Sequence, residues 1–593
     1  KYITSAVKST LVGYQAGYLL TTGDYNTAIG HQALSSITDS SQNTAVGYRA
    51  GLSLMTGAYS NTIMGFDAML QASGSSFANV VIGDRAAYGA GDFDNTIAIG
   101  TMALNELRGA NGTGDSNIAI GAEAGRQQSS GSANVFIGYQ SGYGAGARSN
   151  NTAVGHQSLK AITTGESNTA VGYLALQDLT TGAQNVGISR LAGGDLTTGN
   201  YNVFIGNEAG RVATTQDELI LIGYKAGYAL NHDDADGAVL IGYQAGMSLT
   251  TSEGVYIGWN AGADADAATV NAIQNVYIGT ETGRYLDDGT HNTAIGYNAM
   301  RSSDSDGQNA NNNVAVGTNA LLAITDGDNN VALGSSAGVA ITTGERNVAI
   351  GAHSLATEDG NGRNIAVGYA SLNALNAGAD AYNIGIGYYA GAALTTGINN
   401  IAIGHALQTH TTGVRNIAIG HNAMADTDAG SNSLGSGDNM FIGFQAGGGT
   451  WADAASNENV GIGNYTLDAA MNGALGNVSI GHSALSAITD GDYNVAIGRQ
   501  ALKENVGGDY NTGVGLNAGT NIGHGTSNTQ YSTVIGSDAG EYATGSYNTF
   551  VGAKAGEGGI TSAPFNSGQN NTAIGYQALT AFTTGNYNVA LGE

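Results

Sequence analysis

One five-residue motif recurs along the whole chain and constrains its fold more than any other feature. The motif Asn-Thr-Ala-Ile-Gly stands complete at residues 26–30, 292–296 and 571–575, and variants of it occur about 33 times. The glycines that close these copies are most often 17 residues apart, with spacings from 16 to 23 residues. A unit this short suits one coil of a solenoid with two short strands, not a helical hairpin. The repeat therefore predicts an all-β fold, a parallel β-solenoid of about 33 coils in one continuous domain over residues 1–593.

Composition supports an ordered repeat and narrows the classes of partner. The 95 glycines occur with a single proline and with regularly spaced Val, Ile and Ala, which is typical of close-packed backbone. The 46 acidic and 19 basic residues give a formal net charge of −27, so we do not expect a nucleic-acid partner. No apolar run is long enough for membrane insertion, and the absence of cysteine rules out disulfides. Because the sequence starts at Lys1 without a signal peptide, we expect a segment of a longer fibrous protein or filament.

Alternation within the motif predicts which side chains share a face. In a strand over 27–29, Thr27 and Ile29 lie on one face and Ala28 lies on the other. We expect the branched residues to point into the core. The turn-rich half of each coil would close that core from the opposite wall through one apolar residue, such as Ile37, Ile162 or Ile324.

Two further positions of the repeat form structural columns when the coils are stacked. The columns include Asn26, Asn43, Asn168 and Asn494, and Gly30, Gly47, Gly172 and Gly498. The asparagines could form a ladder of side-chain amides, or they could simply tolerate a left-handed corner. The glycines either supply positive φ or leave room for a neighbouring backbone. Ser189 interrupts the glycine column, so its backbone angles should decide between these two interpretations.

Intervals longer than 17 residues carry their additional residues at one place in the repeat, before the next Asn. We expect irregular loops along one edge, which could serve recognition or could be tolerated insertions. The segments concerned are 302–312, 425–438, 520–531 and 557–570.

Aromatic residues recur directly after the closing glycine. Tyr224, Tyr243 and Trp259 come from three consecutive coils and could form a ladder that contacts a glycan or another chain. Alternatively, such rings only shield the edge of the core. Histidine occupies the same position at His405 and His421, but nothing indicates the convergent ligands of a metal site, so we expect an exposed polar column.

Acidic turns and isolated carboxylates give weaker signals. The turns at 326–328 and 490–492 could hold Ca²⁺, although the calcium-binding nonapeptide of β-rolls is not repeated, and solvated turns are the alternative. No catalytic motif occurs in the sequence, and scattered acids do not reveal the carboxylate pair of a glycosidase. We therefore expect a protein that is not an enzyme and has no required cofactor.

The motif resembles the head repeats of trimeric autotransporter adhesins, through NTAVG at Asn43, NIAIG at Asn117 and Asn416, and NVAIG at Asn347 and Asn494. That resemblance implies a left-handed parallel β-roll, three chains packed side by side, and a place outside the cell. Similar repeats occur in phage tail fibres. The usual coil is somewhat longer here than in the adhesins, and their heptad stalk and membrane anchor do not follow.

These observations favour a structural or adhesive extracellular fibre segment, on a cell surface or in a virion. We expect self-association as a homotrimer or an end-to-end filament, with a surface glycan or host receptor as a further partner. The alternatives are a phage tail fibre shaft or receptor-binding protein, an ice-binding solenoid and a polysaccharide-cleaving tailspike. Ice binding is disfavoured because Val and Ile interrupt the Thr ranks at the inward position, and because the outward Ala column is interrupted by Phe136, Phe204, Tyr256 and Tyr277.

Overall fold

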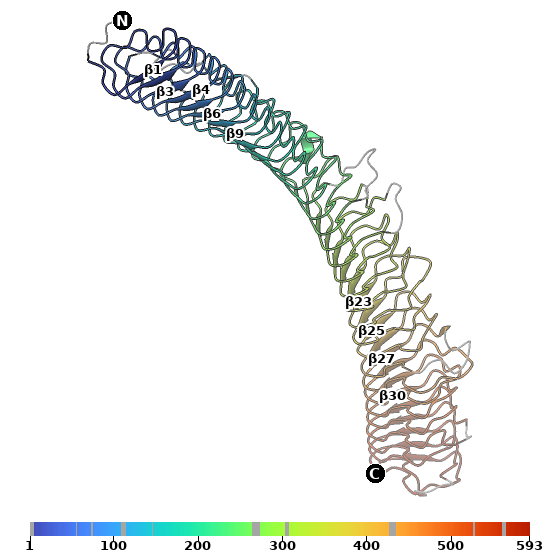
Figure 1. The fold of residues 1–593 in the computed structure, drawn as a ribbon. Helices are drawn as coiled ribbons and strands as arrows, with labels where there is room; N and C mark the ends of the chain where they lie inside the picture. Colours follow the sequence, from blue (N-terminus) through green and yellow to red (C-terminus); the bar gives the residue numbers. More distant parts are fainter. Residues whose placement is uncertain are drawn as a thin grey trace. The chain divides into compact units, whose positions relative to one another are not determined.

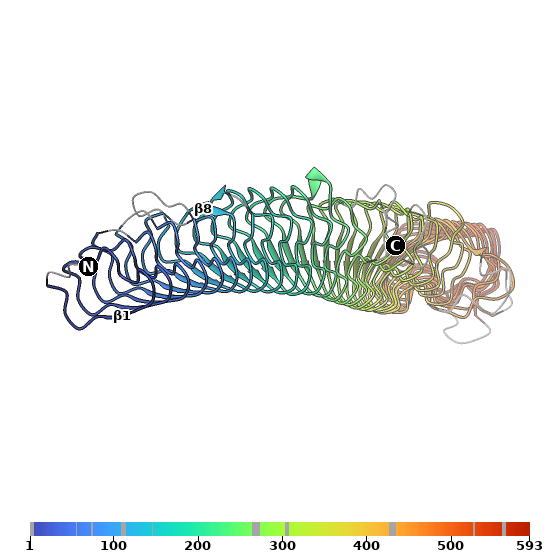
Figure 2. The same cartoon turned by 45° about the horizontal axis from the view of Figure 1, so that its top comes forward.

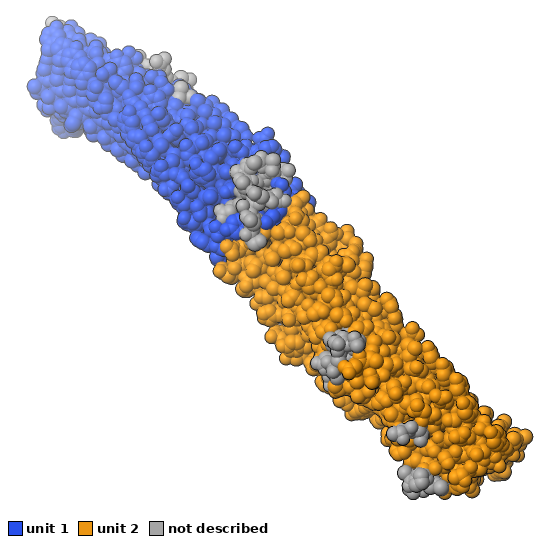
Figure 3. All heavy atoms as spheres, turned by 90° about the vertical axis from the view of Figure 1, so that its right-hand side faces the viewer, with its two compact units in different colours: residues 1–292, 304–308 blue, residues 293–303, 309–593 orange. Residues whose placement is uncertain are grey.

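The computed structural model describes residues 5–54, 56–72, 75–89, 91–107, 114–144, 146–263, 273–286, 288–302, 308–425, 435–525, 528–559 and 565–593. The chain divides into two compact units, coloured separately in Figure 3. Unit 1 comprises Lys1–Asn292 and Asp304–Gln308, and unit 2 comprises Thr293–Ser303 and Asn309–Glu593. Each unit is a parallel β-solenoid, as predicted, with strands that lie side by side like rungs (Figure 1). Two further expectations stay predictions: one continuous domain over 1–593, and a left-handed solenoid.

The described residues of unit 1 form a ladder of sixteen three-residue strands. These strands are β1 (Thr10–Val12), β2 (Thr27–Ile29), β3 (Thr44–Val46), β4 (Thr62–Met64), β5 (Val80–Ile82), β6 (Ile97–Ile99), β7 (Ile118–Ile120), β9 (Val135–Ile137), β11 (Thr152–Val154), β12 (Thr169–Val171), β13 (Val186–Ile188), β14 (Val203–Ile205), β15 (Ile220–Ile222), β16 (Val239–Ile241), β17 (Val255–Ile257) and β18 (Val276–Ile278).

The described residues of unit 2 form a ladder of seventeen strands of the same length. They are β19 (Thr293–Ile295), β20 (Val314–Val316), β21 (Val331–Leu333), β22 (Val348–Ile350), β23 (Ile365–Val367), β24 (Ile384–Ile386), β25 (Ile401–Ile403), β26 (Ile417–Ile419), β27 (Met440–Ile442), β28 (Val460–Ile462), β29 (Val478–Ile480), β30 (Val495–Ile497), β31 (Thr512–Val514), β32 (Thr533–Ile535), β33 (Thr549–Val551), β34 (Thr572–Ile574) and β35 (Val589–Leu591).

Successive strands pair in parallel and in register, so equivalent positions of the repeat stack on one another. In the pairing of β2 with β3, Ala28 lies beside Ala45 and Ile29 beside Val46. Across the described residues the other walls add only the short pair β8 (Gln128–Ser130) with β10 (Gly146–Ala147), four isolated bridges and the 3-10 turn η1 (Asp233–Ala235). Figure 2 shows β8 on the opposite side of the coils from β1.

The prediction of two strands per coil was therefore wrong for the described coils, which carry one regular strand each. The physical reason lies in the turn-rich half, where non-glycine residues repeatedly adopt positive φ. Gln32 and Leu34, for example, have φ of 58° and 50°. Such angles prevent an extended strand. Coil-to-coil hydrogen bonds nevertheless continue along this wall, as from Leu34 N to Ala50 O at 3.0 Å.

The predicted orientation of the strand residues was also wrong. Ala28, the middle residue of β2, is fully buried, whereas Ile29 is 39 % exposed and Thr27 is partly exposed. The burial pattern repeats in the other ladder strands, whose middle residue faces inward, although it is only partly buried in β1 and β35. The closing residues Ile37, Ile162 and Ile324 are fully buried, as predicted. Because these large side chains already fill the narrow coil from the opposite wall, the middle strand position is usually left with the volume of alanine.

Coils with a large middle residue compensate at another position. Six coils place a buried aromatic ring at the middle of the strand, and each has glycine six residues later, where many other coils carry a buried Leu or Met. The pairs are Phe136 with Gly142, Phe204 with Gly210, Tyr256 with Gly262, Tyr277 with Gly283, Phe441 with Gly447 and Phe550 with Gly556. In these six coils the glycine leaves the space that the ring occupies.

The buried asparagines form the predicted amide ladder. Asn168 Oδ1 accepts hydrogen bonds from the backbone N and the Nδ2 of Asn185, at 2.9 and 3.1 Å. Asn168 Nδ2 itself donates to Gly182 O at 2.9 Å and to Asn151 Oδ1 at 3.1 Å. The left-handed corner exists, but the residue before the asparagine adopts it, as Ser167 does with φ of 60°. The ladder interpretation is therefore the correct one.

The glycine column needs both positive φ and a small residue. Gly30 has φ of 136°, and a Cβ on it would lie 2.2 Å from Gly47 O in the next coil. Ser189 keeps the register of β13 on both sides but has φ of 115°, against 140° at Gly172 and 135° at Gly206. The coil thus imposes positive φ even on a serine, and the strain is borne by the serine.

Parts of the predicted edge loops lie outside the described residues, namely 303–307, 426–434, 526–527 and 560–564. The prediction of an irregular recognition edge therefore stays a prediction for those segments. Several longer intervals are fully described, among them the one between Gly223 and Gly242, whose additional residues include η1 before the next strand, as expected.

Candidate functional site

The outward side of each ladder is a surface without charge. It is formed by the first and third residues of every ladder strand, which we call the strand face. Each of these residues is Thr, Val, Ile, Leu or Met. The third residues are often more than a third exposed, up to 47 % at Met64 away from the terminal strands. A continuous apolar surface of this kind is uncommon on a chain with a net charge of −27, and large exposed apolar patches mark interaction sites.

The predicted aromatic ladder is present beside the strand face. The ring centroids of Tyr224 and Tyr243 are 5.1 Å apart, and those of Tyr243 and Trp259 are 6.2 Å apart, with nearly parallel planes. The three side chains are 39–46 % exposed. What they contact outside this chain stays a prediction.

Other ring stacks occur in the same column and include its histidines. One stack runs Tyr14, His31, Tyr48, Phe66, with successive centroids 5.0–5.1 Å apart. His405 and His421 lie 5.3 Å apart, close to the single coil spacing that was expected. Among the described residues, His, Asp and Glu side chains do not gather in groups of three or more that could hold a metal ion.

A second ring column was missed by sequence reasoning. It occupies the position before the Asn, where Tyr493, Tyr510, Tyr531 and Tyr547 stack with centroids 4.9–5.6 Å apart. The recurring dipeptide Tyr-Asn, as at 25–26 and 493–494, was the signal that could have revealed it. Along the sequence of a coil, one ring column therefore comes before the strand and the other comes after it.

The acidic turns serve the backbone of neighbouring coils. Asp328 Oδ1 accepts from Asn311 N at 2.7 Å, and Asp492 Oδ1 accepts from Leu475 N at 2.8 Å. Burial raises the pKa of the Asp492 carboxyl, and the bond from Leu475 partly offsets that effect. These contacts give the carboxylates a structural role, and calcium binding at them stays a prediction.

Two buried polar side chains were not anticipated. Burial lowers the pKa of His410 to about 4, and its Nε2 lies 2.8 Å from Ser436 O. His410 stands at the closing-wall position that Leu394 holds in the preceding coil. Burial also lowers the pKa of Arg148 to about 9, so it remains charged at neutral pH, with Gly142 O and Gly144 O as acceptors.

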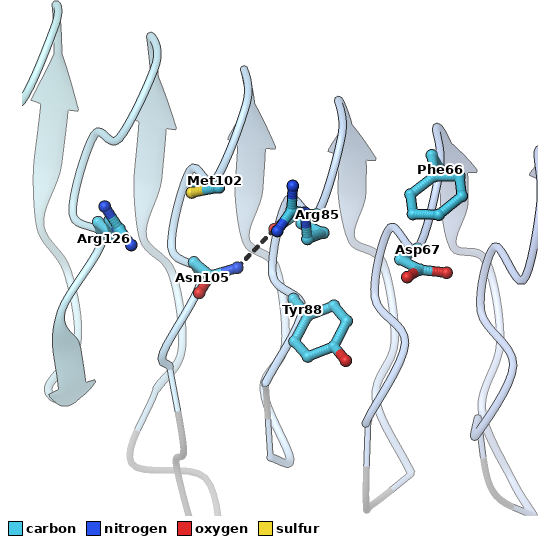
Figure 4. A pocket seen from close by; sticks show the side chains of 7 residues that line it. All are labelled: Phe66, Asp67, Arg85, Tyr88, Met102, Asn105 and Arg126. Atoms are coloured by element: carbon cyan, nitrogen blue, oxygen red, sulfur yellow. Dashed lines mark hydrogen bonds between the residues drawn. The ribbon is translucent and has the colours of Figure 1, made fainter.

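A surface pocket of about 470 Å³ lies on unit 1, where the stack that ends at Phe66 gives way to smaller residues (Figure 4). It spans four coils. Its walls are Phe66, Asp67, Arg85, Tyr88, Met102, Asn105 and Arg126. The Asp67 carboxylate is held by both Arg49 Nε and Nη2, at 2.8 and 2.6 Å. Asn105 Nδ2 donates to Arg85 O at 2.9 Å, which leaves its carbonyl oxygen as an acceptor at the pocket wall.

Comparison with known proteins finds no family model that matches this chain and no matching curated protein. In the part of the chain that the structure describes, no helix combines the length and apolar character needed to cross a bilayer. The likeness to adhesin head repeats therefore rests on the repeat motif and the solenoid fold.

Proposed function

We propose that this chain is a structural and adhesive extracellular fibre segment, not an enzyme, that self-associates through its strand face. The observation that carries the proposal is the strand face itself, in which all outward residues are uncharged. A coil exposes about 10 Å of strand, and coils repeat about every 4.8 Å, so one unit offers roughly 800 Å². That value equals the roughly 800 Å² per partner of a standard protein interface.

A second copy of the same chain is the occupant best matched to this face. Only a partner with the same coil spacing can place an apolar residue opposite each strand over the whole ladder. The acidic residues lie elsewhere on the coil, so two copies can approach through the face without placing carboxylates opposite one another. Three copies can enclose their faces around one axis with closed symmetry, which makes a homotrimer like that of the resembling adhesins our first choice.

The oligomeric state tests this proposal. The wild-type chain should sediment as a trimer, and the Ile188→Lys/Ile220→Lys variant should dissociate, because two charges per copy would be buried. Thr181→Lys/Thr198→Lys, on exposed turn positions of neighbouring coils, is the matched control and should remain trimeric. A wild-type chain that stays monomeric at high micromolar concentration would falsify the proposal. Electron microscopy would distinguish the trimer from an end-to-end filament.

Adhesion would use the ring columns as many weak contacts that add through multivalency. Tyr243→Ala/Trp259→Ala should weaken binding to a glycan array or host surface, while Tyr493→Ala/Tyr510→Ala in the second column tests whether position matters. Equal binding by all three proteins would remove the rings from the adhesive role. The same self-association and adhesion would apply if the chain were part of a phage tail fibre in a virion.

Ice binding is a second candidate, because the orientation of the strand residues favours it. The Thr ranks at 10, 27, 44 and 62 point outward, and Phe136, Phe204, Tyr256 and Tyr277 point inward. The aromatic rings therefore do not interrupt the outward face, whereas Val and Ile still interrupt its Thr ranks. A regular array of hydroxyl and methyl groups can order water, and thermal hysteresis that is lost in Ile188→Lys/Ile220→Lys would support this function over self-association.

A further inference from the structure

The carboxylates at and beside the pocket shown in Figure 4 are already bound by arginines of this chain. The carboxylate of Asp67 is occupied by Arg49. Glu123, which pairs with Arg126 Nη1 at 2.7 Å, also accepts from Gln140 at 2.7 Å. Arg126 also lines the pocket, but its Nε is buried and has no hydrogen-bond partner among the described residues, so a ligand cannot reach that atom. A ligand at this site would therefore have to supply acceptors.

Arg85 adds a second guanidinium, whose N–H groups are only weakly engaged within the chain. Its contacts to Asp84 are 3.5 Å long, and both side chains are about 40 % exposed, so that ion pair is weak. A guanidinium in this state can give two parallel N–H bonds to a carboxylate. The two arginines lie on coils separated by the coil of Met102 and Asn105, as Figure 4 shows.

Phe66 supplies an apolar wall at the same place. It is the last ring of the stack from Tyr14, because the equivalent residue of the next coil is Asp84. With no further ring stacked on it, the Phe66 side chain is 51 % exposed and lines the pocket. An aromatic ring beside planar polar groups is suited to a sugar, whose C–H face packs on the ring while its oxygens bond.

From this arrangement we propose that the pocket binds a carboxylated sugar residue of the uronic acid class. The sugar ring packs on Phe66, and its carboxylate accepts from Arg85. Asn105 Oδ1 accepts from a hydroxyl. The pocket volume of about 470 Å³ suits one or two sugar residues. This inference rests on the proposed adhesive function and names one ligand class for it.

Calorimetric titration of the full chain with a linear tetramer of galacturonic acid tests the site. The neutral tetramer of galactose and inorganic sulfate serve as comparison ligands. We expect the acidic tetramer to bind about 10-fold more tightly than either, since only it offers both the carboxylate and the ring face. Equal binding of sulfate would overturn the sugar assignment, and equal binding of the neutral tetramer would overturn the carboxylate assignment.

Substitutions at the pocket test where the acidic tetramer binds. Arg85→Gln and Phe66→Ala should each lower affinity for the acidic tetramer about 10-fold. Arg190→Gln is the matched control, an exposed arginine of unit 1 that pairs with Glu208 at 2.7 Å, and should bind as the wild type does. Unchanged binding by Arg85→Gln would place the ligand elsewhere and overturn the pocket. Sedimentation of the same samples reports self-association separately, so failure of this inference and failure of the proposed fibre are distinguishable.

Discussion

The ring of Phe204 occupies the space that a side chain at Gly210 would need. A Cβ on Gly210 would lie 2.4 Å from Phe204 Cε1, closer than any such contact can be. In coils with alanine at the middle of the strand, the equivalent of Gly210 is often a buried leucine, such as Leu34 opposite Ala28. In these two kinds of coil, the large side chain therefore stands at one of the two positions and the small residue at the other.

Exchanging the two residues should therefore cost much less than changing one. We expect Phe204→Ala alone to reduce the free energy of unfolding by about 3–5 kcal/mol, because it leaves a cavity. Gly210→Leu alone should also destabilise, through the clash with the ring. The double variant should recover most of the loss, as measured in a double-mutant cycle by denaturant unfolding. Additive effects of the two substitutions would contradict the shared volume.

Ser189 should be a site where glycine stabilises. Its φ of 115° lies in a region that costs a non-glycine residue about 1–3 kcal/mol. After allowance for the greater freedom of glycine in the unfolded chain, Ser189→Gly should stabilise by about 1 kcal/mol. Ser167→Gly, in the less strained left-handed region with φ of 60°, is the control and should give a smaller gain. A lower denaturation midpoint for Ser189→Gly would refute the strain.

Asn168 should be essential to its stretch of the ladder. Asn168→Ala removes the acceptor of Asn185 N and the donor to Gly182 O, both of which are buried. We expect a loss of about 2–3 kcal/mol. Asn207→Ala, in the surface column after the glycine, should change stability by less than about 0.5 kcal/mol. Similar thermal unfolding of the two variants would mean that the amide ladder contributes little.

His410 should make unit 2 sensitive to acid. Its pKa is about 4 in the fold, whereas the unfolded chain binds the proton near 6.5. Its contribution to stability is thus complete above about pH 6.5 and is lost as the pH falls towards 4, by about 3 kcal/mol in total. Burial raises the pKa of Asp468 to about 6, and this acts in the opposite direction, because the protonated carboxyl is favoured in the fold.

The comparison of wild type with His410→Leu isolates the histidine from Asp468. Leucine is the residue found at this position in the preceding coil, and Asn416 Nδ2 retains Ser436 O as an acceptor at 2.9 Å. The difference in unfolding free energy between the two proteins should grow as the pH is lowered from 6.5 to 4. A constant difference over that range would mean that the protonation of His410 is the same in the folded and the unfolded chain, which would contradict a lowered pKa.

Much of the fold could be predicted from the repeat, because stacking like on like leaves few choices. The Asn168 ladder, the closing residue Ile162 and the ring contact of Tyr243 with Trp259 all follow from one register. The inward and outward faces did not follow. Period-two alternation tells which residues share a face, but the side that is buried depends on how much volume the opposite wall supplies.

The pocket could not be predicted, for a different reason. Phe66, Arg85 and Arg126 are far apart in the sequence, and they occupy different positions of the repeat in different coils. A repeat reveals what its copies have in common, whereas a site built from different positions of several coils can be found only once the coils are placed. His410 was likewise not identified from the sequence, although the Thr-Thr-Gly that follows it is typical of a closing residue.

The in-register ladder also bears on how such a chain can change over generations. Each coil presents to its successor the same backbone groups that its predecessor presented to it, as the matched pairing of β2 with β3 and of β11 with β12 illustrates. If one whole coil were duplicated or lost in the gene, the remaining neighbouring coils would still pair through the same backbone hydrogen bonds. The number of coils is therefore a quantity that evolution can adjust one coil at a time with little cost to stability.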